Sequence, residues 1–104
     1  PAKAKGYIDA LRNRAHAAVR PSYTLNDVLD ERSRELYCEG LRRTDLIRFN
    51  QFGGTQATYK WELKGGSTNG TTFTKAYNVY PLPSSEVRSN KNLTQIDGYN
   101  EVQN

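Results

Sequence analysis

The amino-acid sequence predicts a mainly α-helical protein: a helical hairpin of two or three helices, followed by a long irregular segment. Apolar residues recur at helical spacing over the first 50 residues, and Pro21 and Gly40 interrupt the pattern at two joints. After Phe52 the composition changes to glycine, threonine and asparagine. Short turns between antiparallel helices produce a helical hairpin. The 104 residues leave room for one domain, with a helical part over 1–50, a Gly-rich excursion over 51–79 and a Pro-containing extended segment over 80–104.

The first expected helix opens the chain and ends before Pro21. Its apolar face is formed by Ile8, Leu11, Ala15, Ala18 and Val19. The residue before a proline is pushed out of helical dihedral angles, so the helix is expected to stop at Arg20.

The second expected helix begins at Thr24, which has the spacing of a capping box with Asp27. Its apolar positions are Val28, Leu29, Leu36 and Tyr37. Cys38, the single cysteine, is then expected to be a small core thiol on a helix. Gly40 predicts a joint, and a third short helix is expected at about 41–50.

The Gly-rich excursion contains two runs of strand-like composition, 58–63 and 72–79, and these predict at most a small β-hairpin. Beyond it, Pro81 and Pro83 fix an extended backbone, and one turn of helix is expected near 85–87.

The charge balance weakens a nucleic-acid interpretation, although the chain has a net charge of +4 and a pI near 9.4. Residues 25–48 hold five arginines against six carboxylates, so the charges in this stretch interleave. Nucleic-acid-binding proteins concentrate positive charge on one face. The sequence also offers one histidine and one cysteine, so no metal ion or cofactor is expected.

Most acids in the second and third expected helices have an arginine one turn away, which is typical of salt-bridged helices. Arg32 lies on the apolar stripe between Leu29 and Leu36, where an unpaired charge would be costly. We therefore expect a structural salt-bridge clamp, with ligand contact by the same residues as the alternative. The clamp residues are Arg32, Glu35, Glu39, Arg42, Asp45 and Arg48.

Two separated motifs resemble the closing signature of SusD-like (SusD/RagB) proteins. They are "VLDERSRELYCEGLRRTDLIR" at 28–48 and "YPLPSSEVRSNKNLTQIDGY" at 80–99, and the helix "GYIDALRNRAHA" at 6–17 is similar to a further element of that family. Leu82, Lys91 and Asp97 depart from the family's commoner Ile, Pro and Asn. Members of the family are several times longer, so the chain resembles their C-terminal portion.

The resemblance implies a non-catalytic oligosaccharide-binding lipoprotein of a starch or polysaccharide utilisation system. Such a protein works on the surface of the outer membrane of Bacteroidetes-type bacteria, as the partner of a TonB-dependent transporter. Its lipidated N-terminal Cys and its tetratricopeptide-like repeats would lie upstream, in the same polypeptide. Within this sequence, Tyr59 and Trp61 are the candidate sugar contacts, because flat rings stack on the apolar faces of sugars. The alternative role for Trp61 is to anchor its loop.

Three other functions stay open at this point. A structural piece with no ligand of its own is the main alternative. A glycoside hydrolase would need two carboxylates across a cleft, one of them with a raised pKa, whereas arginines beside the helical acids lower theirs. A basic nucleic-acid-binding module is expected to lose affinity steeply with salt.

Overall fold

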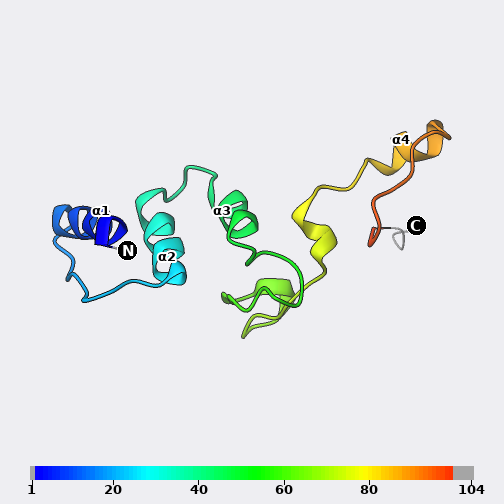
Figure 1. Cartoon of the computed structure of the whole chain (residues 1–104). Coiled ribbons are helices and arrows are strands. Elements are labelled where there is room, and N and C mark those ends of the chain that lie inside the picture. The colour runs from blue at the N-terminus through cyan, green and yellow to red at the C-terminus, as the bar shows by residue number, and fades with distance from the viewer. Residues whose placement is uncertain (1, 100–104) are drawn as a thin grey trace. The chain divides into compact units, whose positions relative to one another are not determined.

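The computed structural model describes residues 2–99 and is mainly helical, as the sequence predicted (Figure 1). The chain divides into two compact units, Pro1–Asp45 and Leu46–Asn104, named here the helical unit and the loop unit. The elements in chain order are α1 (Ala2–Arg14), α2 (Leu25–Glu35), α3 (Arg42–Arg48), the 3₁₀ turns η1 (Lys64–Gly66) and η2 (Lys75–Asn78), and α4 (Ser84–Ser89). None of the helices within residues 2–99 has the length and apolarity needed to cross a membrane.

Helix α1 ends at Arg14, six residues before the end expected at Arg20. His16 takes a left-handed conformation with φ of 55°, and the N–H of Ala17 turns back to the carbonyl of Arg12 at 2.8 Å. The Arg12 Nε donates to the carbonyl of Ala18 at 2.7 Å, which fixes the departing chain. The expected apolar positions Ala18 and Val19 therefore lie outside the helix and are exposed.

Helix α2 begins where the sequence predicted. The Thr24 hydroxyl accepts the N–H of Asp27 at 3.1 Å, and the Asp27 carboxylate accepts the N–H of Thr24 at 2.8 Å. This reciprocal capping box satisfies two N–H groups at the helix end that would otherwise lack a partner. The side chain of Leu29, which belongs to α2, is fully buried.

Helix α2 stops at Glu35, so two expectations for the following residues were wrong. Cys38 is exposed and takes a left-handed conformation in a turn, instead of forming a core thiol on a helix. Tyr37, expected on the apolar face, is 79% exposed. Gly40, with φ of 73°, completes the turn and confirms the predicted joint before α3.

The Gly-rich segment folds without strands: the backbone over 58–63 is irregular, and 72–79 contains the 3₁₀ turn η2, so the hairpin that the sequence allowed is not formed. The segment closes instead through isolated hydrogen bonds, from Gly54 to the carbonyl of Phe73 at 2.8 Å and from Thr71 to the carbonyl of Lys64 at 2.9 Å. Gly70, with φ of 71°, lies so close to the chain that a Cβ there would meet the Trp61 carbonyl oxygen at 2.4 Å. Glycines at such points favour loops over ladders.

The extended segment that follows is tied to the end of the described chain. The Gln95 amide pairs with both backbone groups of Leu82, donating to its carbonyl at 2.8 Å and accepting its N–H at 3.0 Å. The Tyr99 hydroxyl donates to the Val79 carbonyl at 2.9 Å. Helix α4 supplies the single helical turn predicted for this region.

Candidate functional site

The helical unit contains a buried charge network shared between α1 and α2. The Glu31 carboxylate accepts from Arg12 of α1 at 2.8 Å and from Arg34 of its own helix at 2.7 Å. Both Glu31 and Arg12 have side chains almost removed from solvent. Burial raises the pKa of Glu31, but the hydrogen bonds from Arg34 and Arg12 together lower it by more, so its pKa lies below the ordinary value.

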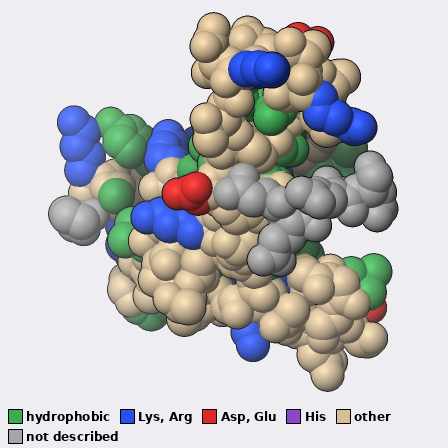
Figure 2. Space-filling model, turned by 90° about the vertical axis from the view of Figure 1, so that its right-hand side faces the viewer, with side chains coloured by type: hydrophobic (Ala, Val, Ile, Leu, Met, Phe, Trp, Pro, Cys, Tyr) green, Lys and Arg blue, Asp and Glu red, His purple; other side chains and the backbone are tan. Residues whose placement is uncertain are grey.

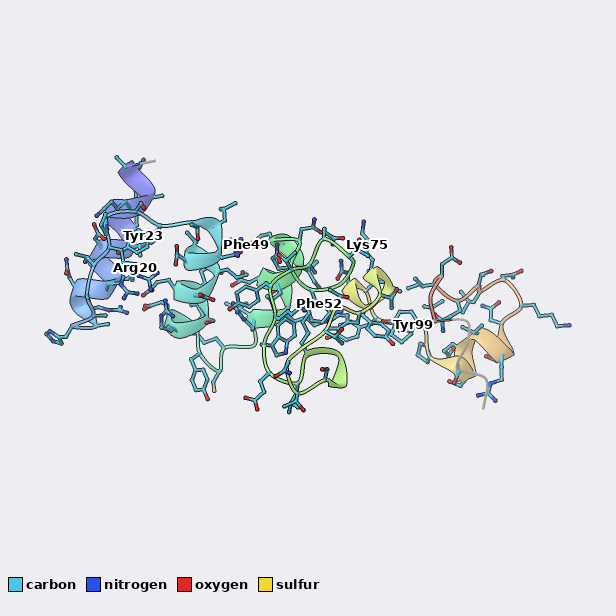
Figure 3. All side chains as sticks on the ribbon, turned by 90° about the horizontal axis from the view of Figure 1, so that it is seen from below. Arg20, Tyr23, Phe49, Phe52, Lys75 and Tyr99 are labelled. Atoms are coloured by element: carbon cyan, nitrogen blue, oxygen red, sulfur yellow. The ribbon has the colours of Figure 1, made fainter. Side chains whose placement is uncertain are left out.

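Further pairs join the same region of the helical unit. Arg14 of α1 binds Glu35 of α2 at 2.5 Å. In the link between these helices, Arg20 binds Asp27 at 2.6 Å, and the Tyr23 hydroxyl donates to Asp9 at 2.8 Å (Figure 3). The Arg14–Glu35 pair joins α1 directly to α2, and the contacts of Arg20 and Tyr23 hold the link between these helices against α2 and α1 respectively.

The clamp around Arg32 forms between α2 and the start of α3. The Arg32 Nε donates to the Asp45 carboxylate at 2.7 Å, and Asp45 is buried. Arg42 donates to the backbone carbonyl of Leu29 at 2.8 Å, which joins the start of α3 to α2. Both contacts join one part of the helical unit to another, which is consistent with the predicted structural clamp.

The other predicted clamp residues occupy different environments. Glu35 faces Arg14, as described above, instead of Arg32 one turn away. Glu39 lies exposed in the turn after α2, and within residues 2–99 its side chain forms no ion pair with the expected Arg43. The Arg48 guanidinium lies 5.5 Å from the ring centre of Phe49. The predicted i,i+4 spacing failed at Glu39 because α2 ends four residues before it.

The loop unit is organised around a row of aromatic rings. Phe52 stacks on Trp61 with centres 6.4 Å apart and meets Phe73 edge-on at 5.1 Å. Phe73 continues to Tyr77 at 5.5 Å, and Tyr77 to Tyr99 at 5.5 Å. Figure 3 shows the labelled Phe52 and Tyr99 within the loop unit. Such pairs contribute stability beyond that of their buried area, so the ring contacts stabilise a unit whose described residues form no sheet.

Lys64 lies at the centre of the Gly-rich segment and is 1% exposed. Its ammonium donates to the backbone carbonyls of Tyr59 at 2.7 Å, Gln51 at 3.2 Å and Ala57 at 3.4 Å. It also lies 4.7 Å from the ring centre of Trp61. Burial, followed by the nearby charge of Lys60, lowers the pKa of Lys64.

Tyr59 and Trp61, the predicted sugar contacts, are both half-buried. The backbone of Tyr59 is fixed on two sides, because its N–H donates to the Gln51 side chain at 2.8 Å and its carbonyl accepts from Lys64. Trp61 is contacted by Phe52, Phe73 and the Lys64 ammonium. This geometry favours the anchoring interpretation of Trp61.

A shallow open depression of about 360 Å³ lies beside Trp61. Small-molecule sites typically begin at about 300 Å³, so the depression is at the lower end of that range. Its lining is mostly polar, as sugar hydroxyls require, and consists of Lys60, Trp61, Glu62, Thr68 and Asn69.

Sequence reasoning missed Lys64 and the aromatic row. A lysine before two glycines resembles an ordinary surface turn, and no spacing rule distinguishes it from Lys60. The rings of Phe52, Phe73 and Tyr99 come from separate stretches, so only the folded chain brings them together. The signal that could have found them was the concentration of aromatic residues beside glycines.

The charged side chains on one face of the molecule do not form a single basic patch (Figure 2). On the face in Figure 2, basic side chains occur at separate places, and one lies beside an acidic side chain. Within residues 2–99, no group of three or more His, Cys, Asp or Glu side chains lies together in a way that could hold a metal ion.

Taken together, these features define a mainly helical protein whose charges serve its own packing and whose aromatic residues hold an irregular loop. A sequence profile described as the SusD family matches residues 1–99. The chain is also 43% identical over 97 residues to the starch-binding protein SusD of Bacteroides thetaiotaomicron. The chain therefore belongs to the SusD family, which confirms the resemblance of its two motifs. The match covers 92% of this chain and 17% of the length of that relative.

Proposed function

We propose that the chain is part of a non-catalytic oligosaccharide-binding protein of an outer-membrane glycan uptake system. The observation that supports this most strongly is the 43% identity to a protein named for starch binding. The lowered pKa of Glu31, which is paired with arginines, is consistent with binding rather than catalysis, because a glycosidic acid needs a raised pKa.

The proposed binding can be tested on the intact protein with maltoheptaose, a linear α-glucan, and with cellohexaose as a β-linked control. Titration calorimetry is expected to give saturable binding of maltoheptaose and weaker or no binding of cellohexaose. An assay of reducing ends is expected to stay flat during a long incubation. A folded protein that binds neither glucan would contradict the proposal, and new reducing ends would contradict its non-catalytic part.

The same proposal includes a partner and a location. The protein would work with a TonB-dependent transporter, as a surface lipoprotein anchored through an N-terminal Cys of the intact polypeptide. Affinity purification from detergent-solubilised outer membranes is expected to retain a large barrel protein. Labelling with palmitate and digestion of whole cells by protease test the anchor and the exposure. A protein that is unlabelled and protected in intact cells would contradict this location.

A second candidate is a purely structural role for these residues within the intact protein. It is supported by the way in which the predicted site side chains are used: Arg32 and Arg42 bind within the helical unit, and Trp61 packs within the loop unit. The glucan contacts would then come from upstream residues. Substitutions throughout 1–99 would change stability and leave the affinity for maltoheptaose unchanged.

A further inference from the structure

The Gly-rich segment lacks the features that usually hold a loop in one conformation. Between 51 and 73 the backbone forms no strand, and glycines are frequent. Leu63, Gly65 and Gly70 have positive φ. A segment of this composition loses much conformational entropy when it folds. Some interaction must offset that loss, and the Lys64 side chain donates three hydrogen bonds to the backbone of the segment.

The side chain of Lys64 binds three backbone carbonyls that precede it in the chain. Its ammonium has three N–H donors, and the carbonyls of Gln51, Ala57 and Tyr59 provide three acceptors at 3.2, 3.4 and 2.7 Å. The acceptors are backbone atoms, so what the ammonium fixes is the path of the chain. These carbonyls point inward to one site and do not form a ladder with a neighbouring strand.

The rings and main chain around Lys64 complete the site. The ammonium lies 4.7 Å from the ring centre of Trp61 and 5.4 Å from that of Phe73, within the range of cation–π attraction. The main chain of Lys64 also accepts the N–H of Thr71 at 2.9 Å and donates to the carbonyl of Trp61 at 3.1 Å. Among the described residues, no carboxylate is found in an ion pair with Lys64, so carbonyls and rings balance its charge.

We propose that the Lys64 ammonium acts as a tethered internal cation that locks the Gly-rich segment 51–73 in one conformation. The lock fixes Trp61 against Phe52 and Phe73, and it thereby shapes the depression lined by Lys60, Trp61, Glu62, Thr68 and Asn69. This inference does not depend on what the depression binds, so it stands or falls separately from the proposed function.

The first test compares substitutions in the intact protein by hydrogen exchange with mass spectrometry. Lys64→Met keeps an unbranched stem of similar length and removes the charge, which leaves three carbonyls without a donor. Exchange of peptides covering 51–73 is expected to accelerate about tenfold, because an unsatisfied buried group is worth one to two factors of ten in an equilibrium. Lys64→Arg is expected to accelerate it as well, since a planar guanidinium does not fit a site built for a compact ammonium.

Lys60→Met provides the matched control, because Lys60 is exposed and belongs to the same segment. Its exchange is expected to match the wild type. Peptides from α1 and α2 report whether a variant has lost its global fold. If Lys64→Met and Lys60→Met exchange alike over 51–73, the lock does not exist.

The second test uses the wild-type protein, so it holds even where a variant fails to fold. Brief labelling with an acetylating reagent, read residue by residue, is expected to modify Lys64 at least tenfold more slowly than Lys60. A lowered pKa alone would make the Lys64 amine more reactive, so slower labelling reports the closed site. Equal labelling of Lys64 and Lys60 would overturn the proposal.

Discussion

Glu31 shows how a single carboxylate can hold two helices together. It is shared by Arg12 and Arg34, and its contact with Arg12 spans 19 residues of chain. Exposed ion pairs contribute at most about 1 kcal/mol, but removing one partner of a buried pair typically costs about 3–5 kcal/mol. Glu31 belongs to the second group, because it and Arg12 are both largely shielded from solvent.

The pH dependence of stability follows from the lowered pKa of Glu31. A carboxyl group with a pKa below its unfolded value stabilises the fold fully above that value, and the stabilisation is lost as the pH falls through the folded pKa. We expect Glu31→Gln to lower the free energy of unfolding by roughly 3 kcal/mol at pH 7. The difference from wild type is expected to shrink below the ordinary glutamate pKa of 4.5. Urea unfolding of the intact protein between pH 7 and pH 3 measures this.

The control for Glu31 is Glu86→Gln, which changes an exposed acid outside the helical unit. It is expected to change stability by less than about 0.5 kcal/mol at every pH. A difference between Glu31→Gln and wild type that stays constant down to pH 3 would show that the carboxylate charge is not what stabilises the network.

The pair of Arg32 and Asp45 is expected to be structural. Asp45 has an 8% exposed side chain, whereas that of Arg32 is 35% exposed, so the cost of breaking the pair lies between the surface and buried cases. Arg32→Ala or Asp45→Ala is expected to cost about 2 kcal/mol, seen as a lower melting temperature of the intact protein. Lys3→Ala, at an exposed lysine, gives the baseline. A variant at 32 or 45 that keeps its melting temperature but loses maltoheptaose affinity would reassign the pair to ligand binding.

At the scale of elements, helix starts were predictable and helix ends were not. Thr24 and Asp27 specify the start of α2 through local chemistry, so the sequence was sufficient there. The end of α1 is marked by His16 in a left-handed conformation, which histidine adopts more readily than most residues but not often enough for a single His to predict a helix end. Cys38 is exposed for a similar reason. Helix α2 ends three residues before it, and Gly40 predicted a joint but not the position of the turn that precedes it.

The Gly-rich segment was the least predictable element. Its strand-like runs have β propensity, but strands need partners, and the close approaches at Gly53 and Gly70 replace ladder contacts. A Cβ at Gly53 would lie 2.6 Å from the Thr74 carbonyl oxygen. The contacts of Lys64 and of the aromatic row join residues that are distant in sequence. Composition could therefore indicate an irregular loop but not which residues lie at its centre.

The capping box of α2 gives a prediction for one element. Thr24→Ala removes the acceptor for the Asp27 N–H and is expected to cost about 1 kcal/mol, equivalent to about fivefold faster exchange of the first-turn amides of α2. Thr24→Ser keeps the hydroxyl and is expected to behave like wild type. Hydrogen exchange of a peptide that covers the start of α2 measures the effect locally. Equal exchange in the alanine and serine variants would show that the cap contributes nothing.

At the scale of the whole molecule, the chain forms ion pairs among its own residues and matches 17% of the length of the starch-binding relative. Its largest exposed apolar side chains include Tyr37 and Leu25 in the helical unit and Tyr80 in the loop unit. Among residues 2–99, four apolar side chains are buried (Ile8, Leu29, Leu46 and Ala57), so ion pairs, carbonyl contacts and ring contacts supplement a small hydrophobic core.

Substitution of Trp61 distinguishes the two roles considered for it, which are anchoring of its loop and stacking on a sugar. If Trp61 anchors its loop, Trp61→Ala is expected to cost about 2 kcal/mol, less than for a fully buried tryptophan, because the ring is half-buried among Phe52, Phe73 and Lys64. The affinity of the intact protein for maltoheptaose, measured well below the melting temperature, would change less than about twofold. Tyr37→Ala provides the matched control, since it removes an exposed ring from the helical unit and is expected to change neither quantity. A tenfold weaker affinity with an unchanged melting temperature would instead make Trp61 a sugar-stacking residue, and the depression beside it a glucan contact.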